Sequence, residues 1–151
     1  MEVKLFTNEI LVSATNERIK NILDNVQNIL KWDSEIGDIS PIDNHKFMIL
    51  RKGAALNKQE VISVITSEDS VTYVSKKGKI EYRVEWVLDK IENHLTKLKQ
   101  NVFLNEKNAF LPMAEIIRPL TQNAFKENLY VLKAVCEQEE QFNGASNFTN
   151  G

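Results

Sequence analysis

Hydrophobic residues near the C-terminal end recur at helical spacing. Downstream of Pro119, they fall on two adjacent stripes when each residue is placed about 100° from the last. These stripes contain Leu120, Ala124, Val131 and Val135, and Phe125, Leu129, Leu132 and Cys136. Together they cover about half of the helix circumference, more than the roughly 100° of one packing face. The stretch from Leu111 to about Glu139 is therefore predicted to be a long helix buried against another layer.

Two prolines set the expected limits of this helix. Pro112 suits the first helical turn, where its missing N–H is not needed. Pro119 removes a donor inside the helix and clashes with the preceding turn. We therefore expect a bend or a break between Ile116 and Leu120.

Most of the remaining chain has the composition and the period-two alternation of strands. The predicted strands are Val3–Ser13, Ile36–Ile42, Lys46–Arg51, Glu60–Thr66, Val71–Ser75, Ile80–Leu88 and His94–Leu104. Pro41 interrupts Ile36–Ile42, so this strand should be short or lie at an edge of the sheet. Glu81, Arg83 and Glu85 lie on the polar face of Ile80–Leu88 and are predicted to be exposed. Gly78 is expected to supply the left-handed residue of the turn over 76–79.

Between the first two strands the period changes to that of a helix. Thr15 or Asn16 can cap a helix over 16–23, whose buried stripe is Ile19, Ile22 and Leu23. Asp24 and Gln27 resemble a capping box for a second short helix over 25–31.

This order predicts an α+β fold of the helix-grip kind. A seven-stranded antiparallel sheet has one apolar face to cover, and the C-terminal helix is the element long enough to cover it. The sheet should curve around that helix, and the two short helices should close one end. We expect a single domain over residues 1–139 and a disordered tail over 140–151, because the tail is small, polar and contains glycine.

Composition narrows the function classes. A net charge of −2 gives no basic face for nucleic acid. A single cysteine, Cys136, excludes an internal disulfide, and its apolar neighbours indicate a buried, unreactive thiol. No apolar run approaches the ~20 residues of a membrane span, and no signal peptide is recognisable, so a cytoplasmic protein without integral membrane association is expected. No dinucleotide, phosphate-loop or histidine metal motif occurs, so we expect no cofactor and no metal.

The segment Val12–Trp32 resembles the START-like, or birch-pollen-allergen, superfamily, also called helix-grip or SRPBCC. The corresponding positions are Ala14, Ile19, Ile22, Leu23 and Trp32. Asn16 and Lys20 depart from the pattern, since proline and an aromatic residue are common there. The order of elements extends the resemblance over residues 3–137, and the small bacterial polyketide cyclase/dehydrase-like proteins are the nearest branch. The resemblance implies an apolar cavity between the sheet and the long helix that binds a small hydrophobic molecule, lipid-like or polyketide-like.

Six residues are candidates to line this cavity: Trp32, Tyr82, Trp86, Thr121, Phe125 and Asn128. Thr121 and Asn128 are the informative polar ones, and either a ligand-facing role or a backbone bond at the groove edge would explain them. His45 and His94 are expected at the surface. Asp33, Glu35 and Asp38 are interpreted as a solvated loop.

Three functions remain open. The leading one is binding of a small hydrophobic ligand by a monomer or homodimer. A polyketide cyclase or dehydratase would need an acid/base pair in the cavity, and no catalytic residue can be named. A protein-interaction module would have its cavity filled by its own side chains.

Overall fold

Seven strands form one antiparallel sheet in the part of the chain that the computed structural model describes, residues 2–52, 57–105 and 113–149. The strands are β1 Glu2–Val12, β2 Ile36–Asp43, β3 Lys46–Arg51, β4 Gln59–Thr66, β5 Ser70–Lys76, β6 Tyr82–Glu92 and β7 Leu95–Asn105. Their order in the sheet is β1-β7-β6-β5-β4-β3-β2, so β2 with its Pro41 lies at an edge, as the proline predicts.

Short helical segments follow β1, and a long helix follows β7. They are α1 Asn16–Asp24, the 3-10 turn Val26–Asn28, α2 Ile29–Trp32 and α3 Met113–Thr149. Thr15 caps α1, and its side chain accepts from the backbone N–H of Arg18. Asn25 caps the 3-10 turn in place of the predicted Asp24, whose carboxylate instead accepts from Thr66.

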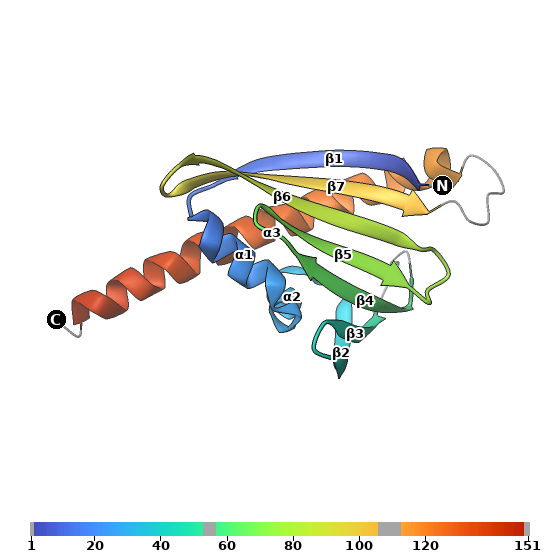
Figure 1. The fold of residues 1–151 in the computed structure, drawn as a ribbon, viewed down its shortest axis with the longest axis horizontal. Helices are drawn as coiled ribbons and strands as arrows, with labels where there is room; N and C mark the ends of the chain where they lie inside the picture. The colour runs from blue at the N-terminus through green and yellow to red at the C-terminus, as the bar shows by residue number, and fades with distance from the viewer. Residues whose placement is uncertain (1, 53–56, 106–112, 150–151) are drawn as a thin grey trace.

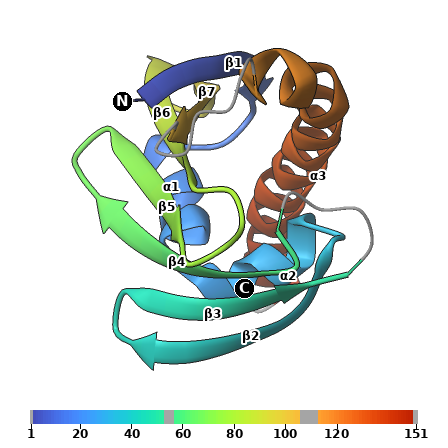
Figure 2. The same cartoon turned by 90° about the vertical axis from the view of Figure 1, so that its right-hand side faces the viewer.

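The sheet curves around the helices. Figure 2 shows it bending from β1 and β7 at the top to β2 at the bottom, with α3 along its open side. Figure 1 shows α1 and α2 near one end of the sheet. The core lies in this concavity and includes the buried Ile19, Ile22 and Leu23 of α1. The α+β helix-grip architecture expected from the sequence is confirmed.

The buried face of α3 is narrower than predicted. Leu129, Leu132 and Cys136 are buried as expected, but Leu120 is 75% exposed and Val131 is 44% exposed. The helix packs chiefly on β1 and α2. Leu120 and Val131, at the margin of the apolar arc, are therefore not covered by β1 or α2. The prediction that these two residues belong to the packing face is wrong.

Pro119 does not break α3, which the structure assigns as one helix through that residue. Of the two expected outcomes, the break does not occur, and the bend agrees with Figure 2, where the first, orange turns run in a different direction from the rest. Arg118 holds this part of the helix against the sheet, since its Nε donates to the carbonyl of Leu5 at 2.7 Å. The predicted helix start at Pro112 lies outside the described residues. At the other end the assigned helix enters the stretch predicted as a tail, and the disorder of 140–151 stays a prediction.

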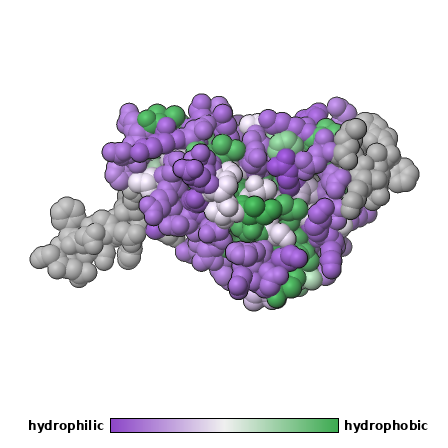
Figure 3. Space-filling model, viewed as in Figure 1, coloured by the Kyte–Doolittle hydropathy of each residue, from purple (hydrophilic) through white to green (hydrophobic). Residues whose placement is uncertain are grey.

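Polar side chains dominate the outer face of β6, as predicted. Arg83 pairs with Glu2 at 2.8 Å, and Glu85 accepts from Asn101 at 3.1 Å. The face of the molecule in Figure 3 is largely hydrophilic, with one apolar area near its lower centre. In the turn before β6, Lys77 adopts the positive φ of 60° that was expected at Gly78.

Candidate site between the sheet and the C-terminal helix

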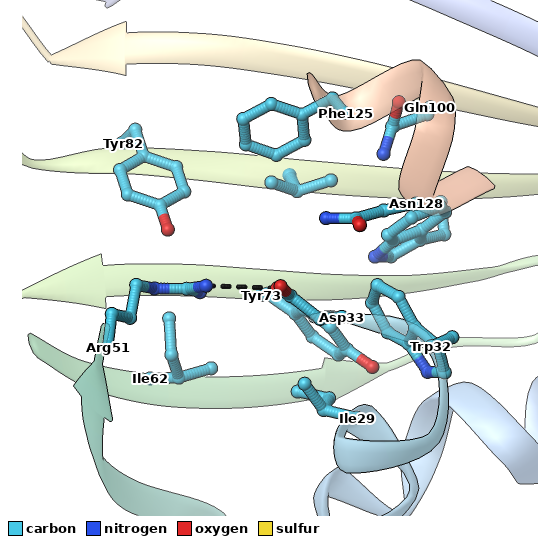
Figure 4. Close-up of a pocket in the computed structure, with 12 residues that line it drawn as sticks. Ile29, Trp32, Asp33, Arg51, Ile62, Tyr73, Tyr82, Gln100, Phe125 and Asn128 are labelled. Carbon is cyan, nitrogen blue, oxygen red and sulfur yellow. Dashed lines mark hydrogen bonds and ion pairs between the residues drawn. The ribbon is translucent and has the colours of Figure 1, made fainter. Parts of the chain in front are cut away.

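A small cavity lies in the concavity of the sheet, beneath α3. Its apolar lining consists of Ile29, Trp32, Ile62, Tyr73, Tyr82, Val84, Trp86 and Phe125. Its polar lining consists of Asp33, Arg51, Gln100 and Asn128, and Figure 4 shows these side chains around a common space. The cavity measures about 30 Å³, room for about two water molecules.

Aromatic rings form one wall of the cavity. Trp32 and Trp86 meet edge to face with their ring centroids 5.5 Å apart, and Tyr73 lies 6.1 Å from Trp86. The Tyr73 hydroxyl donates to the carbonyl of Leu23, which fixes this ring against α1. Burial, followed by the charges of nearby carboxylates, raises the Tyr73 pKa far above its usual range. This wall therefore consists of neutral rings in preferred aromatic geometry.

Arg51, at the end of β3, pairs with two carboxylates inside the molecule. Its Nε lies 2.7 Å from Glu60 Oε1, and its Nη1 lies 2.9 Å from Asp33 Oδ2. The side-chain exposed fractions are 11% for Arg51, 0% for Glu60 and 8% for Asp33. Figure 4 shows Arg51 extending across the cavity toward Asp33. The interpretation of Asp33 as part of a solvated loop is therefore wrong, because Arg51 binds it inside the molecule.

Glu60 is fully satisfied by its surroundings. Its carboxylate accepts from Arg51 Nε, Asn57 Nδ2, Ser75 Oγ and Tyr82 Oη at 2.7, 2.8, 2.7 and 2.9 Å. Asn57 also bonds to both the N–H and the carbonyl of Ile80. A Cβ added to Gly78 would lie 2.5 Å from Asn57 Cγ. The glycine is thus needed for this close approach.

Burial and the neighbouring charges together shift the pKa values of the residues in this cluster. Burial alone would lower the pKa of Arg51, but Tyr82, Glu60 and Asp33 favour the cation and raise it above the usual range. Burial is the largest cause that raises the pKa of Tyr82, and the bond to Glu60 adds to it. Tyr82 is therefore a neutral hydrogen-bond donor at neutral pH. Burial and then the charge of Asp33 raise the pKa of Glu35.

An amide chain forms the other polar side of the cavity. Asn8 Nδ2 donates to Gln100 Oε1 at 3.0 Å and to the backbone carbonyl of Gln122 at 3.4 Å. Gln122 Nε2 donates back to Asn8 Oδ1 at 3.4 Å. These bonds join β1, β7 and α3 through buried polar groups and fix the orientation of the Gln100 amide.

A groove of about 270 Å³ opens between α2 and α3 beside the cavity. Leu30, Lys31, Trp32, Asp33 and Ser34 form one side, and Glu127, Asn128 and Val131 form the other. Trp32, Asp33 and Asn128 also line the cavity. These three side chains therefore separate the buried space from the surface groove.

Solved structures share this architecture across nearly the whole chain. A START superfamily protein from Mycobacterium smegmatis aligns with a TM-score of 0.73 at 14% identity, over 91% of this chain and 97% of that one. The chain has a START-like fold. Norcoclaurine synthase from Thalictrum flavum, solved as a point mutant with a transition-state analogue, gives a TM-score of 0.70 at 9% identity, over 93% and 97% of the two chains. A conserved protein from Geobacillus kaustophilus gives 0.70 at 14%, over 87% and 94%.

No protein-family model matches the chain, and no curated protein matches it. Identities of 9% to 14% establish the fold alone, because one fold carries many functions. What the chain binds must therefore be argued from its own cavity.

The START-like cavity brings together five of the six residues selected from the sequence. Trp32, Tyr82, Trp86, Phe125 and Asn128 line it. Thr121 is buried but does not line it, and its hydroxyl donates to the carbonyl of Ile117 at 2.9 Å. That bond is the backbone alternative considered for Thr121. His45 and His94 are exposed in turns, as expected.

The sequence reasoning missed the polar residues that point into the fold. Glu60 has the strand parity of Ile62 and Val64, and Gln100 has that of Leu98 and Val102. Alternation alone therefore placed both on the buried face. Their polar character led us to overlook them.

The described residues contain neither a metal-binding cluster nor a membrane-spanning helix. No group of three or more histidine, cysteine, aspartate or glutamate side chains there is arranged to hold a metal ion. None of the helices in this part of the chain has the length and apolar character to cross a membrane. Cys136, the single cysteine of the sequence, is buried in the core.

Proposed function

We propose that this chain binds a small hydrophobic molecule between the sheet and α3, with the α2–α3 groove as its entrance. The observation that carries the proposal is the aromatic cavity, with few polar groups, adjoining a groove with exposed apolar side chains. Leu30 is 51% exposed and Val131 is 44% exposed at that groove. A mostly apolar pocket with a few orienting polar groups is the usual form of a small-molecule site.

The volumes of the cavity and the groove indicate where a ligand would lie. Small-molecule sites commonly occupy roughly 300–1,000 Å³, whereas the buried cavity holds about 30 Å³ and the groove about 270 Å³. A ligand would therefore lie mainly in the groove and place one end in the cavity, with rearrangement of Trp32 or Asn128 between them. Apolar burial would contribute about 25 cal/mol per Å² before the costs of binding.

The small cavity favours one alternative, a protein-interaction module whose interior is filled by its own side chains. The cyclase or dehydratase alternative receives less support. Asp33 and Glu60 are both engaged by Arg51, so neither carboxylate is free to act as a base on a substrate. Binding without an assigned reaction is therefore the function proposed, and the oligomeric state stays a prediction of monomer or homodimer.

The experiment uses the two tryptophans of the chain, Trp32 and Trp86, because both line the cavity. Titration with fatty acids, flavonoids and polyketide-like aromatics should change their fluorescence saturably, and calorimetry should give the same affinities. Native mass spectrometry after solvent extraction would identify any copurified molecule.

A matched pair of variants localises the site. Val131→Glu places a charge in the groove and should weaken binding, whereas Leu120→Glu, about three turns away on the same helix, should not. Absence of binding by every compound, with nothing extracted, would contradict the proposal and support the interaction module.

A further inference from the structure

We propose that the inner end of the cavity binds an uncharged carbonyl oxygen of the ligand through the side-chain N–H groups of Gln100 and Trp86. This inference rests on the proposed binding function and names its ligand class. The ligand is a small apolar molecule that carries a ketone, aldehyde, ester or quinone oxygen.

The sheet register places the two residues that carry these donors next to each other. Trp86 of β6 pairs directly with Gln100 of β7, which sets their Cβ atoms about 5 Å apart on the inner face. Gln100 is 0% exposed and Trp86 is 1% exposed. Gln100 Nε2 and Trp86 Nε1 have no hydrogen-bond partner among the described residues. Since nearly all buried polar groups are paired, two adjacent unpaired donors need an explanation.

The amide chain fixes which end of Gln100 faces the cavity. The backbone carbonyl of Gln122 can only accept, so the Asn8 group that contacts it is the amino group. That amino group also donates to Gln100, which must present its oxygen there. The Gln100 amino group is therefore left for the cavity, and Figure 4 shows its nitrogen on the side of Asn128.

The fully buried side-chain groups of the cavity lining that lack a partner are all donors. Besides Gln100 Nε2 and Trp86 Nε1, they include Trp32 Nε1, which points away from Gln100 in Figure 4. Within the described residues, no fully buried side-chain oxygen of the cavity lining lacks a hydrogen bond. The complementary ligand group is therefore an acceptor, and a carbonyl oxygen can accept from two donors at once.

Charge selects a neutral acceptor over a carboxylate. Two buried carboxylates, Asp33 and Glu60, face the single guanidinium of Arg51 at the other side of the cavity. A third carboxylate would enter an environment that is already net negative and shielded from water. An ammonium group would be excluded for a different reason, because it cannot accept from Gln100 or Trp86.

Size is consistent with a carbonyl group. The cavity of about 30 Å³ admits a carbonyl group but no larger ligand as it stands. The apolar remainder would then lie past Trp32 and Asn128, in the groove that both residues share with the cavity.

The test compares ligands that differ only at this group. Acetophenone and ethylbenzene have nearly the same shape, and benzoate and benzylamine supply the charged alternatives. Calorimetry on the full chain should show acetophenone binding about tenfold more tightly than ethylbenzene, the value of one good buried hydrogen bond. Benzoate and benzylamine should bind more weakly than acetophenone.

Substitutions distinguish the loss of a hydrogen bond to the ligand from a general effect on folding. Gln100→Leu and Trp86→Phe should each reduce the preference for acetophenone while ethylbenzene still binds. Asn101→Leu, the neighbouring amide on the outer side of β7, should leave the preference unchanged. The carbonyl stretching frequency of bound acetophenone should be lower in the wild type than in Gln100→Leu, because N–H donors weaken the C=O bond.

The outcomes distinguish this inference from the proposed function. Equal affinities for acetophenone and ethylbenzene would overturn the inference and leave hydrophobic binding intact. This result is expected if water molecules, and not the ligand, accept from the two donors. A preference that survives both variants, or tighter binding of benzoate or benzylamine, would also overturn it. Failure of all four compounds to bind would overturn this inference, whereas the proposed function is contradicted only if the fatty acids, flavonoids and polyketide-like aromatics also fail to bind.

Discussion

Asp33 and Arg51 line a cavity otherwise formed mainly by rings and aliphatic side chains, and the buried Glu60 pairs with Arg51. Glu60 receives four donors, so its burial is compensated by its partners. Such a cluster gives little net stability compared with apolar residues of the same volume, but removal of one member leaves another charge buried without a partner. The cluster therefore fixes the positions of β3, β4 and the turn after α2.

Replacement of Glu60 tests this dependence. Glu60→Ala should lower the free energy of unfolding by about 3–5 kcal/mol, because Arg51 loses its shortest ion pair and three other donors lose their acceptor. Chemical denaturation measures the change. Glu9→Ala removes a carboxylate from the outer side of β1 and should stay within about 0.5 kcal/mol of wild type. Equal effects in the two variants would show that Glu60 is solvated.

For single residues, the sequence predicts which side chains are buried better than it predicts which residues they bind. Strand parity places Glu60 and Gln100 inside, and the same parity identified Tyr82 and Trp86. The partners could not be predicted, because they lie far apart in the chain. Asn8 and Gln100 meet only when β1 pairs with β7, and Arg51 and Asp33 meet only when the end of β3 lies beside the turn after α2. Asn128 was selected as an isolated polar residue in an apolar arc, which is a local signal.

The C-terminal helix α3 covers the open side of the sheet through a narrow apolar face. Leu132 is 0% exposed and lies among core residues from the sheet and α1. Leu120, on the same helix, is 75% exposed. The two leucines therefore provide a matched comparison of packing on one element.

Leu132→Asp should destabilise the protein by several kcal/mol, since it places an unpaired charge in the core. Leu120→Asp should change the free energy of unfolding by less than about 1 kcal/mol, because that side chain already contacts water. Thermal melts of the two variants measure the difference. An unchanged melting temperature for Leu132→Asp would show that α3 packs through another face.

Glu137 links α3 to the segment after β1. Its carboxylate accepts from the backbone N–H of Ser13 at 2.7 Å and pairs with Lys133. Burial raises its pKa, but the bonds from Lys133 and Ser13 outweigh burial and hold the pKa below the ordinary value of 4.5. The stabilisation is therefore present above about pH 4.5 and is lost as pH falls through the lower folded pKa.

Glu137→Gln should be less stable than wild type at pH 7, and this gap should narrow as pH falls below about 4.5. Denaturation at a series of pH values measures the gap, and Glu127→Gln, exposed on the same helix, serves as the control. A gap that is constant with pH would show that the ionised form of Glu137 makes no special contribution.

Elements were predicted more reliably than their ends or angles. Strand-like length and composition, with clear period-two alternation in Ile80–Leu88, located all seven strands, although β2 is mostly exposed. Local pattern left open whether α3 bends or breaks at Pro119, and the structure shows one helix through that residue. Arg118 bonds to Leu5 at this point, a contact that depends on the sheet.

In the whole molecule, a buried and mostly apolar cavity adjoins a surface groove, with Trp32, Asp33 and Asn128 between them. Asn128 lines both spaces and is half-buried. Its position makes it suited to contact a ligand that extends from the groove into the cavity. Ligand binding and global stability are then linked, because a ligand that binds only the folded state stabilises it.

Asn128→Leu should leave the unliganded protein folded and weaken a ligand with a polar group about tenfold, the value of one hydrogen bond. At a ligand concentration 100 times the wild-type Kd, the stabilisation should fall from about 2.7 to about 1.4 kcal/mol. Ligand-dependent thermal shifts measure this loss. Asn123→Leu, an exposed amide on the same helix, should retain the full shift. A loss of similar size in both variants, or in neither, would contradict the role assigned to Asn128 at the junction of cavity and groove.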